Sequence, residues 1–149
     1  MEEMKLLLVD DEERFLETTQ KLLEKKGIHT LTALSGEAAL ESIRVNRPHV
    51  VILDVKMPGM DGIATLKAVK REHPMTEVIM LTGHATVESA IEGLKSGARD
   101  YLMKPADLEE ILQKAEDAFN NRQQIEEKIR VAHMRHVMKS PQEILKESK

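Results

Sequence analysis

Short apolar runs alternate along the chain with stretches of helical periodicity, and this alternation restricts the folds open to it. Three of the runs are wholly apolar: Leu6–Val9, Val50–Leu53 and Val78–Leu81. Strands that are apolar on both faces are typical of parallel sheets covered by helices on both sides. Because strand–helix–strand crossovers are right-handed, the sequence predicts an α/β fold with a doubly wound parallel sheet.

Two weaker segments complete the predicted five-stranded sheet. His29–Leu34 alternates weakly between apolar and polar residues, as an exposed edge strand does, and Tyr101–Met103 is a short final strand. With the second strand at an edge, the expected strand order is 2-1-3-4-5.

Capping residues and breakers mark the predicted helix ends. Ser35 is expected to cap one helix, and Asp107, with Glu110 three residues later, to open the last one. Gly27 and Gly97 are the expected stops of two others.

The composition fits a single domain with a tail. The chain has 149 residues, of which 41% are apolar and 32% are charged. Aromatic residues make up only 2%, so aliphatic side chains must build the core. No cysteine is present, which excludes disulfides, thiol chemistry and thiolate metal sites.

The start of the chain and the lack of a long apolar run predict a cytoplasmic protein. Met1–Glu3 is acidic and unlike a signal peptide, and no apolar run approaches the length of a transmembrane helix. The net charge of −4 gives no general reason to expect nucleic-acid binding.

Carboxylates follow two of the predicted strands. Asp10 and Asp11 come directly after the first strand, and Asp54 ends the third. In the expected order these two strands flank the point where the strand order reverses, which is where open parallel sheets form their sites. Three close carboxylates repel one another, and a hard cation bound by oxygen, Mg²⁺ above all, would offset that repulsion.

Two further polar groups are expected at the same edge of the sheet. Thr82 ends the fourth strand and Lys104 the fifth. A hydroxyl, an ammonium and a metal ion suit the oxygens of a transferred phosphoryl group, and a carboxylate can accept that group as an acyl phosphate. The acidic loop Val9–Arg14 argues against a flavin or nucleotide-phosphate loop, which would be rich in Gly, Ser or Thr.

Four sequence blocks, in this order and at these intervals, resemble the receiver domain of two-component response regulators, the chemotaxis-Y-like family. The blocks are Asp10-Asp11, Leu53–Gly62, Leu81–Gly83 and Tyr101–Pro105. The resemblance covers about Lys5 to Asn120 and implies a flavodoxin-like fold. Gly83–Thr86 and Gly97–Tyr101 are most similar to receivers of the nitrogen-regulator type.

The resemblance implies roles for the residues expected in a crevice at the carboxyl ends of the strands. Asp54 would accept a phosphoryl group from a sensor histidine kinase. Asp11 directly, and Asp10 through water, would hold Mg²⁺, and the backbone carbonyl of Lys56 would complete the protein ligands. Lys104 would pair with the phosphoryl oxygens, through a Lys-Pro peptide bond that is usually cis in the family. Such a module is not an enzyme in the usual sense but assists its own phosphorylation and dephosphorylation.

The resemblance also implies a switch. Thr82 would move to hydrogen-bond the phosphate, and Tyr101 would turn inward as Thr82 moves. This would change the protein-interaction face of the fourth helix, the fifth strand and the fifth helix. Lys56 and His84 would flank the phosphoryl group and tune its lifetime.

The loop after Asp54 is expected to leave room for the metal and the phosphoryl group. The Pro58-Gly59 turn and Gly62 would carry the backbone sharply away from the crevice. Asp61 is expected to cap the next helix rather than join the site.

The helical pattern of the last segment continues past the usual end of a receiver. From Ile111 to His136, positions of one face recur at alternating steps of four and three, a coiled-coil spacing weakened by Arg122 and His136. An unbroken helix from Asp107 to Lys139 would be about 50 Å long.

We therefore expect a receiver domain over residues 1–120 and a helical extension over residues 121–149, with no separate output domain. The extension holds seven Lys or Arg and four Glu, but it is too short for a helix-turn-helix domain and lacks interleaved aromatics for RNA. The extension is expected either to be a solvated helix or to bind a downstream protein or a second copy. Binding is favoured because Ile125 and Ile129 would otherwise be exposed. A dimer through the face of the fourth helix, the fifth strand and the fifth helix is the other expected arrangement.

Two other interpretations stay open. The chain could be the receiver part of a longer transcription activator, which the nitrogen-regulator-like blocks and the helical tail suit. It could also be a Mg²⁺-dependent phosphatase of the haloacid-dehalogenase type, which forms an aspartyl phosphate too. That class requires a second aspartate two residues after its nucleophile, where this chain has Lys56, and a cap that no insertion here is long enough to form.

Overall fold

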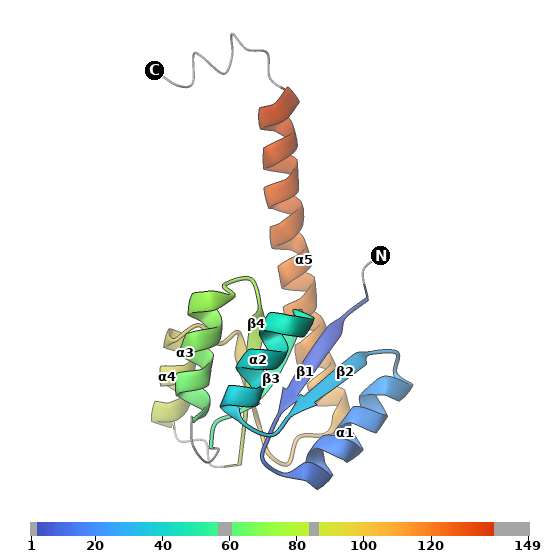
Figure 1. Cartoon of the computed structure of the whole chain (residues 1–149), viewed down its shortest axis with the longest axis vertical. Helices are drawn as coiled ribbons and strands as arrows, with labels where there is room; N and C mark the ends of the chain where they lie inside the picture. The colour runs from blue at the N-terminus through green and yellow to red at the C-terminus, as the bar shows by residue number, and fades with distance from the viewer. Residues whose placement is uncertain (1–2, 57–60, 84–86, 139–149) are drawn as a thin grey trace.

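The structure, a computed structural model, describes residues 3–56, 61–83 and 87–138 and contains one five-stranded parallel sheet (Figure 1). The strand order is β2-β1-β3-β4-β5, as predicted. The strands are β1 (Lys5–Val9), β2 (His29–Ala33), β3 (Val50–Asp54), β4 (Glu77–Thr82) and β5 (Asp100–Met103). The predicted edge position of the weak second strand is therefore confirmed.

Helices cover both faces of this sheet. They are α1 (Glu13–Lys25), α2 (Gly36–Asn46), α3 (Gly62–Glu72), α4 (Val87–Lys95) and α5 (Leu108–Met138). Side chains of α1 and α5 pack on one face, and side chains of α2 and α3 pack on the other. In the part of the chain that the structure describes, no helix is both long enough and apolar enough to cross a membrane.

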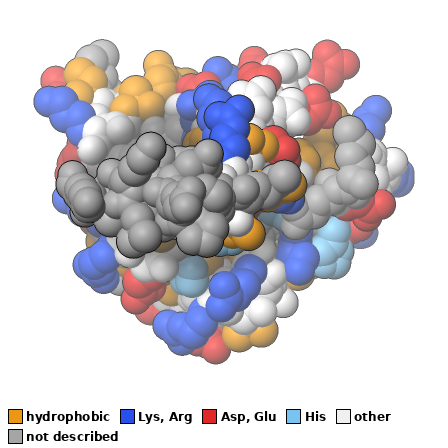
Figure 2. Space-filling model, turned by 90° about the horizontal axis from the view of Figure 1, so that it is seen from above, with side chains coloured by type: hydrophobic (Ala, Val, Ile, Leu, Met, Phe, Trp, Pro, Cys, Tyr) orange, Lys and Arg blue, Asp and Glu red, His pale blue; other side chains and the backbone are white. Residues whose placement is uncertain are grey.

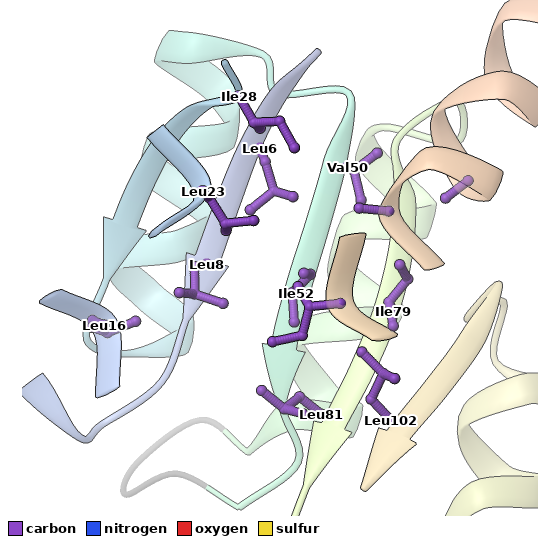
Figure 3. Close-up of a cluster of buried hydrophobic side chains, with 13 residues drawn as sticks. Leu6, Leu8, Leu16, Leu23, Ile28, Val50, Ile52, Ile79, Leu81 and Leu102 are labelled. Atoms are coloured by element: carbon purple, nitrogen blue, oxygen red, sulfur yellow. The ribbon is translucent and has the colours of Figure 1, made fainter. Parts of the chain in front are cut away.

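The core consists of two aliphatic layers separated by the sheet. Alternate strand residues supply each layer: Leu6 and Leu8 of β1 face α1 and α5, while Leu7 and Val9 face the opposite helices. Figure 3 shows the first layer, where leucine and isoleucine side chains from β1, β3, β4 and α1 converge. Burial on both faces explains why these strands read as continuous apolar runs.

The predicted caps are confirmed. Side-chain oxygens of Ser35, Asp61 and Asp107 accept hydrogen bonds from backbone N–H groups three residues later, at 3.1, 2.7 and 2.8 Å. Gly27 and Gly97 follow α1 and α4 with φ of +86° and +109°, a conformation that favours glycine.

Side chains of α1 occupy the outer edge of β2. Gln20 Nε2 donates to the carbonyl oxygen of Thr30 at 2.8 Å, and Glu24 Oε1 accepts from the N–H of the same residue at 2.9 Å. These contacts satisfy backbone groups that an edge strand would otherwise offer to another chain.

Helix α5 runs from the carboxyl end of the sheet to the amino end and then continues beyond the domain (Figure 1). Contacts to the domain persist past residue 120: Arg122 Nη1 donates to the carbonyl oxygen of Pro48 at 3.3 Å. Arg122 therefore packs against the domain rather than forming part of a free seam. Farther along, Ile125 and Ile129 are 37% and 58% exposed. Figure 2 looks down on this end and shows basic and acidic side chains intermixed over the visible face.

Candidate functional site

Two buried carboxyl groups lie together at the carboxyl end of the sheet. Val9 of β1 is in register with Leu53 of β3, so the next residues, Asp10 and Asp54, come at adjacent strand ends. Asp10 is fully buried and Asp54 is 6% exposed. The predicted meeting of these acids, at the point where the strand order reverses, is where the fold places them.

Asp10 is held by two different contacts. Its Oδ1 accepts a hydrogen bond from the backbone N–H of Glu12 at 2.9 Å. Its Oδ2 lies 2.6 Å from the Nζ of Lys104 and has no further hydrogen-bond partner among the described residues. One buried oxygen thus depends on a single ammonium group.

Lys104 crosses the crevice to reach this oxygen. It follows β5, which β3 and β4 separate from β1, and its side chain is 18% exposed. Burial, the largest effect, lowers the pKa of Lys104, but the hydrogen bond to Asp10 and the charges of Asp10, Asp54 and Glu12 together outweigh it and raise the pKa. The ammonium group therefore stays charged in the crevice.

Asp54 has an unusually high pKa. Burial and then the neighbouring Asp10 raise it from 3.8 to about 6; Asp11 adds a smaller increase. Lys104 and a 3.3 Å hydrogen bond from the backbone N–H of Lys56 to Oδ1 oppose this increase. The carboxyl group is thus crowded by like charges and only partly compensated.

Three consecutive acids could hold a metal ion. Asp10, Asp11 and Glu12 each offer a carboxylate oxygen, and these oxygens lie within 4.8 Å of one another. Asp11 and Glu12 are exposed, so an ion can approach from solvent. These oxygen donors fit a hard divalent cation such as Mg²⁺, and so does the buried Oδ2 of Asp10, which has no partner but Lys104 among the described residues.

The remaining predicted residues occupy different positions around the crevice. Thr82 is 3% exposed at the end of β4, and its carbonyl oxygen accepts a hydrogen bond from the N–H of Lys104 at 2.7 Å. Tyr101 on β5 is 39% exposed, and Lys56 is also exposed. The Lys104–Pro105 peptide bond is cis, as the family resemblance implied. His84 and the Pro58-Gly59 turn lie outside the described residues.

Gly62 allows the chain to turn tightly behind Asp54. Its N–H donates to the carbonyl oxygen of Val55 at 2.9 Å. A Cβ at this position would overlap the backbone oxygen of Asp54 and come within 2.5 Å of the Cα of Val55. A side chain cannot be accommodated there without displacing the strand end that carries Asp54.

Two residues near the crevice were not among the predicted site residues. Glu12 Oε1 lies 3.6 Å from the Nζ of Lys104, and the same Nζ lies 4.9 Å from the centroid of the Phe15 ring. Glu12 directly continues the Asp10-Asp11 run, so its sequence position was a usable indication. Phe15 fitted the apolar periodicity of a helix, and nothing in the sequence indicated that its ring also faces Lys104.

Fold and crevice together define a class: a doubly wound α/β domain that gathers acids, a buried hydroxyl residue and a lysine at its switch point. Residues 6–116 match the response regulator receiver domain family, and the chain belongs to that family. Receivers are phosphoaccepting signalling modules of two-component systems rather than conventional enzymes, and they act with histidine kinases.

Several known proteins are similar over this region. The DNA-binding transcriptional regulator NtrC of Klebsiella pneumoniae is 35% identical over 117 residues, which are 78% of this chain and 25% of NtrC. The transcriptional regulatory protein ZraR of Escherichia coli strain K12 is 41% identical over 114 residues, 76% of this chain and 26% of ZraR. This chain therefore spans about a quarter of the length of these relatives.

A solved structure gives a similar result. The crystal structure of the receiver domain of NtrX from Brucella abortus superimposes with a TM-score of 0.73 at 33% identity, covering 77% of this chain and 98% of that one. A longer crystal structure of NtrX covers 87% of this chain and 30% of its own, with a TM-score of 0.81 at 30% identity.

Proposed function

We propose that Asp54 is the phosphoacceptor of this receiver. The observation that carries the proposal is the buried Asp54 carboxyl, which shares the crevice with Asp10 and Lys104 and has its pKa raised to about 6. A carboxylate oxygen of Asp54 would attack phosphorus and form the O–P bond of an acyl phosphate. The bond between phosphorus and the donor's leaving group would break, and the leaving group would keep that electron pair. Lys104 would stabilise the phosphoryl oxygens as an ammonium.

Mg²⁺ would supply the positive charge that the acids lack. Asp10 and Asp11 are the proposed ligands together with Asp54 and the carbonyl of Lys56. The carboxylate oxygens of Asp10 and Asp11 belong to a group of oxygens that lie within 4.8 Å of one another, which supports a hard cation beside this acid pair. The adjacent Glu12 belongs to the same group of acids and offers the cation a further carboxylate oxygen. A divalent cation there would lower the pKa of Asp54 and keep it ionised for attack.

Phosphorylation in the crevice would change the conformation at the β5 edge of the sheet. Thr82 would hydrogen-bond the phosphoryl group, and Tyr101, now partly exposed, would turn inward. Lys56 and His84 are proposed to tune the lifetime of the acyl phosphate. The backbone hydrogen bond between Thr82 and Lys104 supports coupling of the two strand ends.

The partners follow from the family and from exposed apolar residues. A sensor histidine kinase would donate the phosphoryl group, in the cytoplasm. A downstream protein, or a second copy, would bind the α4–β5–α5 face or the α5 extension, where Leu94, Met103 and Ile129 are exposed. The names of NtrC and ZraR favour the alternative in which this receiver is part of a longer transcription activator.

Phosphoryl transfer from acetyl phosphate tests the proposal. With Mg²⁺ present, the parent chain should gain one phosphoryl group by intact mass, Asp54→Asn should gain none, and Asp61→Asn should behave as the parent. Asp61 is a suitable control because it is an exposed cap of α3 close to the site in sequence. Unchanged labelling of Asp54→Asn would contradict the assignment.

A further inference from the structure

The aromatic ring of Phe15 lies beneath the ammonium group of Lys104. The distance from Nζ to the ring centroid is 4.9 Å, within the range of a cation–π contact. The chain contains only two Phe and one Tyr, so an aromatic ring at this place is not a by-product of an aromatic-rich core.

The contacts that hold the Lys104 ammonium come from one short segment. Among the described residues, Asp10 Oδ2 at 2.6 Å and Glu12 Oε1 at 3.6 Å lie in the loop between β1 and α1, and the Phe15 ring lies in the first turn of α1. Phe15 is itself fixed, because it is partly buried and packs against the core layer between the sheet and α1 and α5. The ring is therefore a rigid support for a flexible side chain.

We propose that Phe15 is a positioning residue that holds Lys104 on the Asp10 side of the crevice in the resting state, so that Mg²⁺ binding and release of Lys104 toward Asp54 are coupled. This inference rests on the proposed function, because it concerns the same lysine and the same acids. It adds a residue whose ring touches neither metal nor phosphoryl group and acts through Lys104.

The coupling follows from competition for one carboxylate. A divalent cation held by Asp10 and Asp11 would repel the ammonium that now lies 2.6 Å from Asp10. Each contact that retains Lys104 at Asp10 therefore opposes metal binding. Removing the ring should strengthen Mg²⁺ binding about two- to fivefold, which is the equivalent of a cation–π contact of about 0.5–1 kcal/mol.

The test compares Phe15→Leu, Phe15→Tyr and Phe119→Leu in the full chain. Phe15→Leu removes the ring, and Phe15→Tyr keeps it. Phe119→Leu is the matched control, because Phe119 packs against the same core layer but its ring contacts His49 at the opposite end of the sheet. Titration with Mg²⁺ alone gives the affinity, and the NMR shift of the Lys104 ε-methylene protons reports the ring current of Phe15.

The parent chain and Phe15→Tyr should show an upfield Lys104 resonance that moves downfield as Mg²⁺ binds. In Phe15→Leu that resonance should already be downfield and Mg²⁺ should bind more tightly, while Phe119→Leu should match the parent. Equal Mg²⁺ affinity in all variants would overturn the inference and leave the proposed function intact. Lack of Mg²⁺ binding in every variant, with the Lys104 resonance still upfield in the parent chain and Phe15→Tyr, would contradict the coupling and the proposed metal site together.

Discussion

The two ends of the sheet bury polar side chains in opposite ways. At the amino end, Glu77 accepts a hydrogen bond from Asn121 of α5 at 3.2 Å, and Nδ1 of His49 accepts one from the N–H of Lys5 at 2.9 Å. At the carboxyl end, Asp10 and Asp54 repel each other as like charges, and within the described ranges Lys104 is the only partner of one oxygen of Asp10.

This difference separates a structural cluster from a functional one. Paired groups at the amino end fix the root of the α5 extension to the domain at little electrostatic cost. Crowded acids at the carboxyl end raise the free energy of the resting state, and a bound cation would lower it. The amino end of the sheet therefore has hydrogen-bonded polar groups that anchor α5, whereas the carboxyl end has crowded carboxylates that a cation would stabilise.

The largest expected effect concerns the backbone that carries the crevice. Gly62→Ala should lower the free energy of unfolding by about 3 kcal/mol, because the new Cβ overlaps backbone atoms of Asp54 and Val55 that cannot move aside. Gly83→Ala is the control: among the described residues, its Cβ would approach only the Lys104 side chain, at 3.8 Å. Urea denaturation measures both, and equal losses in the two variants would contradict the close approach at Gly62.

Neutralising the crevice acid should stabilise the fold. Because the folded state raises the pKa of Asp54 from 3.8 to about 6, it retains a proton more readily than the unfolded chain between these values. Stability is thus lost as pH rises from about 4 to about 6, and the loss is complete above about 6. Asp54→Asn should therefore gain about 2 kcal/mol at pH 7.5 without metal, and the gain should vanish near pH 4.

Urea denaturation in the presence of a chelator, at both pH values, checks this gain. Asp61→Asn should change stability by less than about 0.5 kcal/mol, because asparagine caps a helix as well as aspartate does. A destabilised Asp54→Asn chain at pH 7.5 would show that the crevice is not under electrostatic stress.

Neutralising the acid at the other end should have the opposite sign and a smaller size. Glu77→Gln should cost about 1 kcal/mol, because its hydrogen bond with Asn121 loses charge assistance. Burial lowers the pKa of the half-buried Lys70, and the negative charge of Glu77 opposes this decrease. The substitution would remove that favourable charge. Glu127→Gln, which breaks an exposed ion pair with Arg130, should cost less than about 0.5 kcal/mol. A gain in stability for Glu77→Gln would remove the contrast between the two ends.

Apolar patterning predicted the strands because both faces of this sheet are buried. It was less accurate at the amino end of β4, which begins at Glu77, one residue before the apolar run Val78–Leu81, because the hydrogen-bonded ladder includes this polar residue. The acids of the crevice could be predicted because each directly follows or ends a buried strand.

Contacts between distant segments could not be predicted. Phe15 and Lys104 meet only because α1 and the end of β5 border the same crevice, and helical periodicity assigns Phe15 to the core without showing what its ring edge or face touches. Arg122 was expected to weaken a coiled-coil seam, yet its bond to Pro48 depends on where α5 crosses the sheet. Sequence patterns fix which face of an element is apolar, whereas such pairings require the packed fold.

Mapping the phosphoryl group tests the central claim most directly. After incubation with acetyl phosphate and Mg²⁺, borohydride reduces an aspartyl phosphate to homoserine, which peptide mass spectrometry locates. We predict homoserine at position 54 and at no other aspartate. Homoserine at position 10 or 11, or none in chains that carry phosphate, would contradict the assignment.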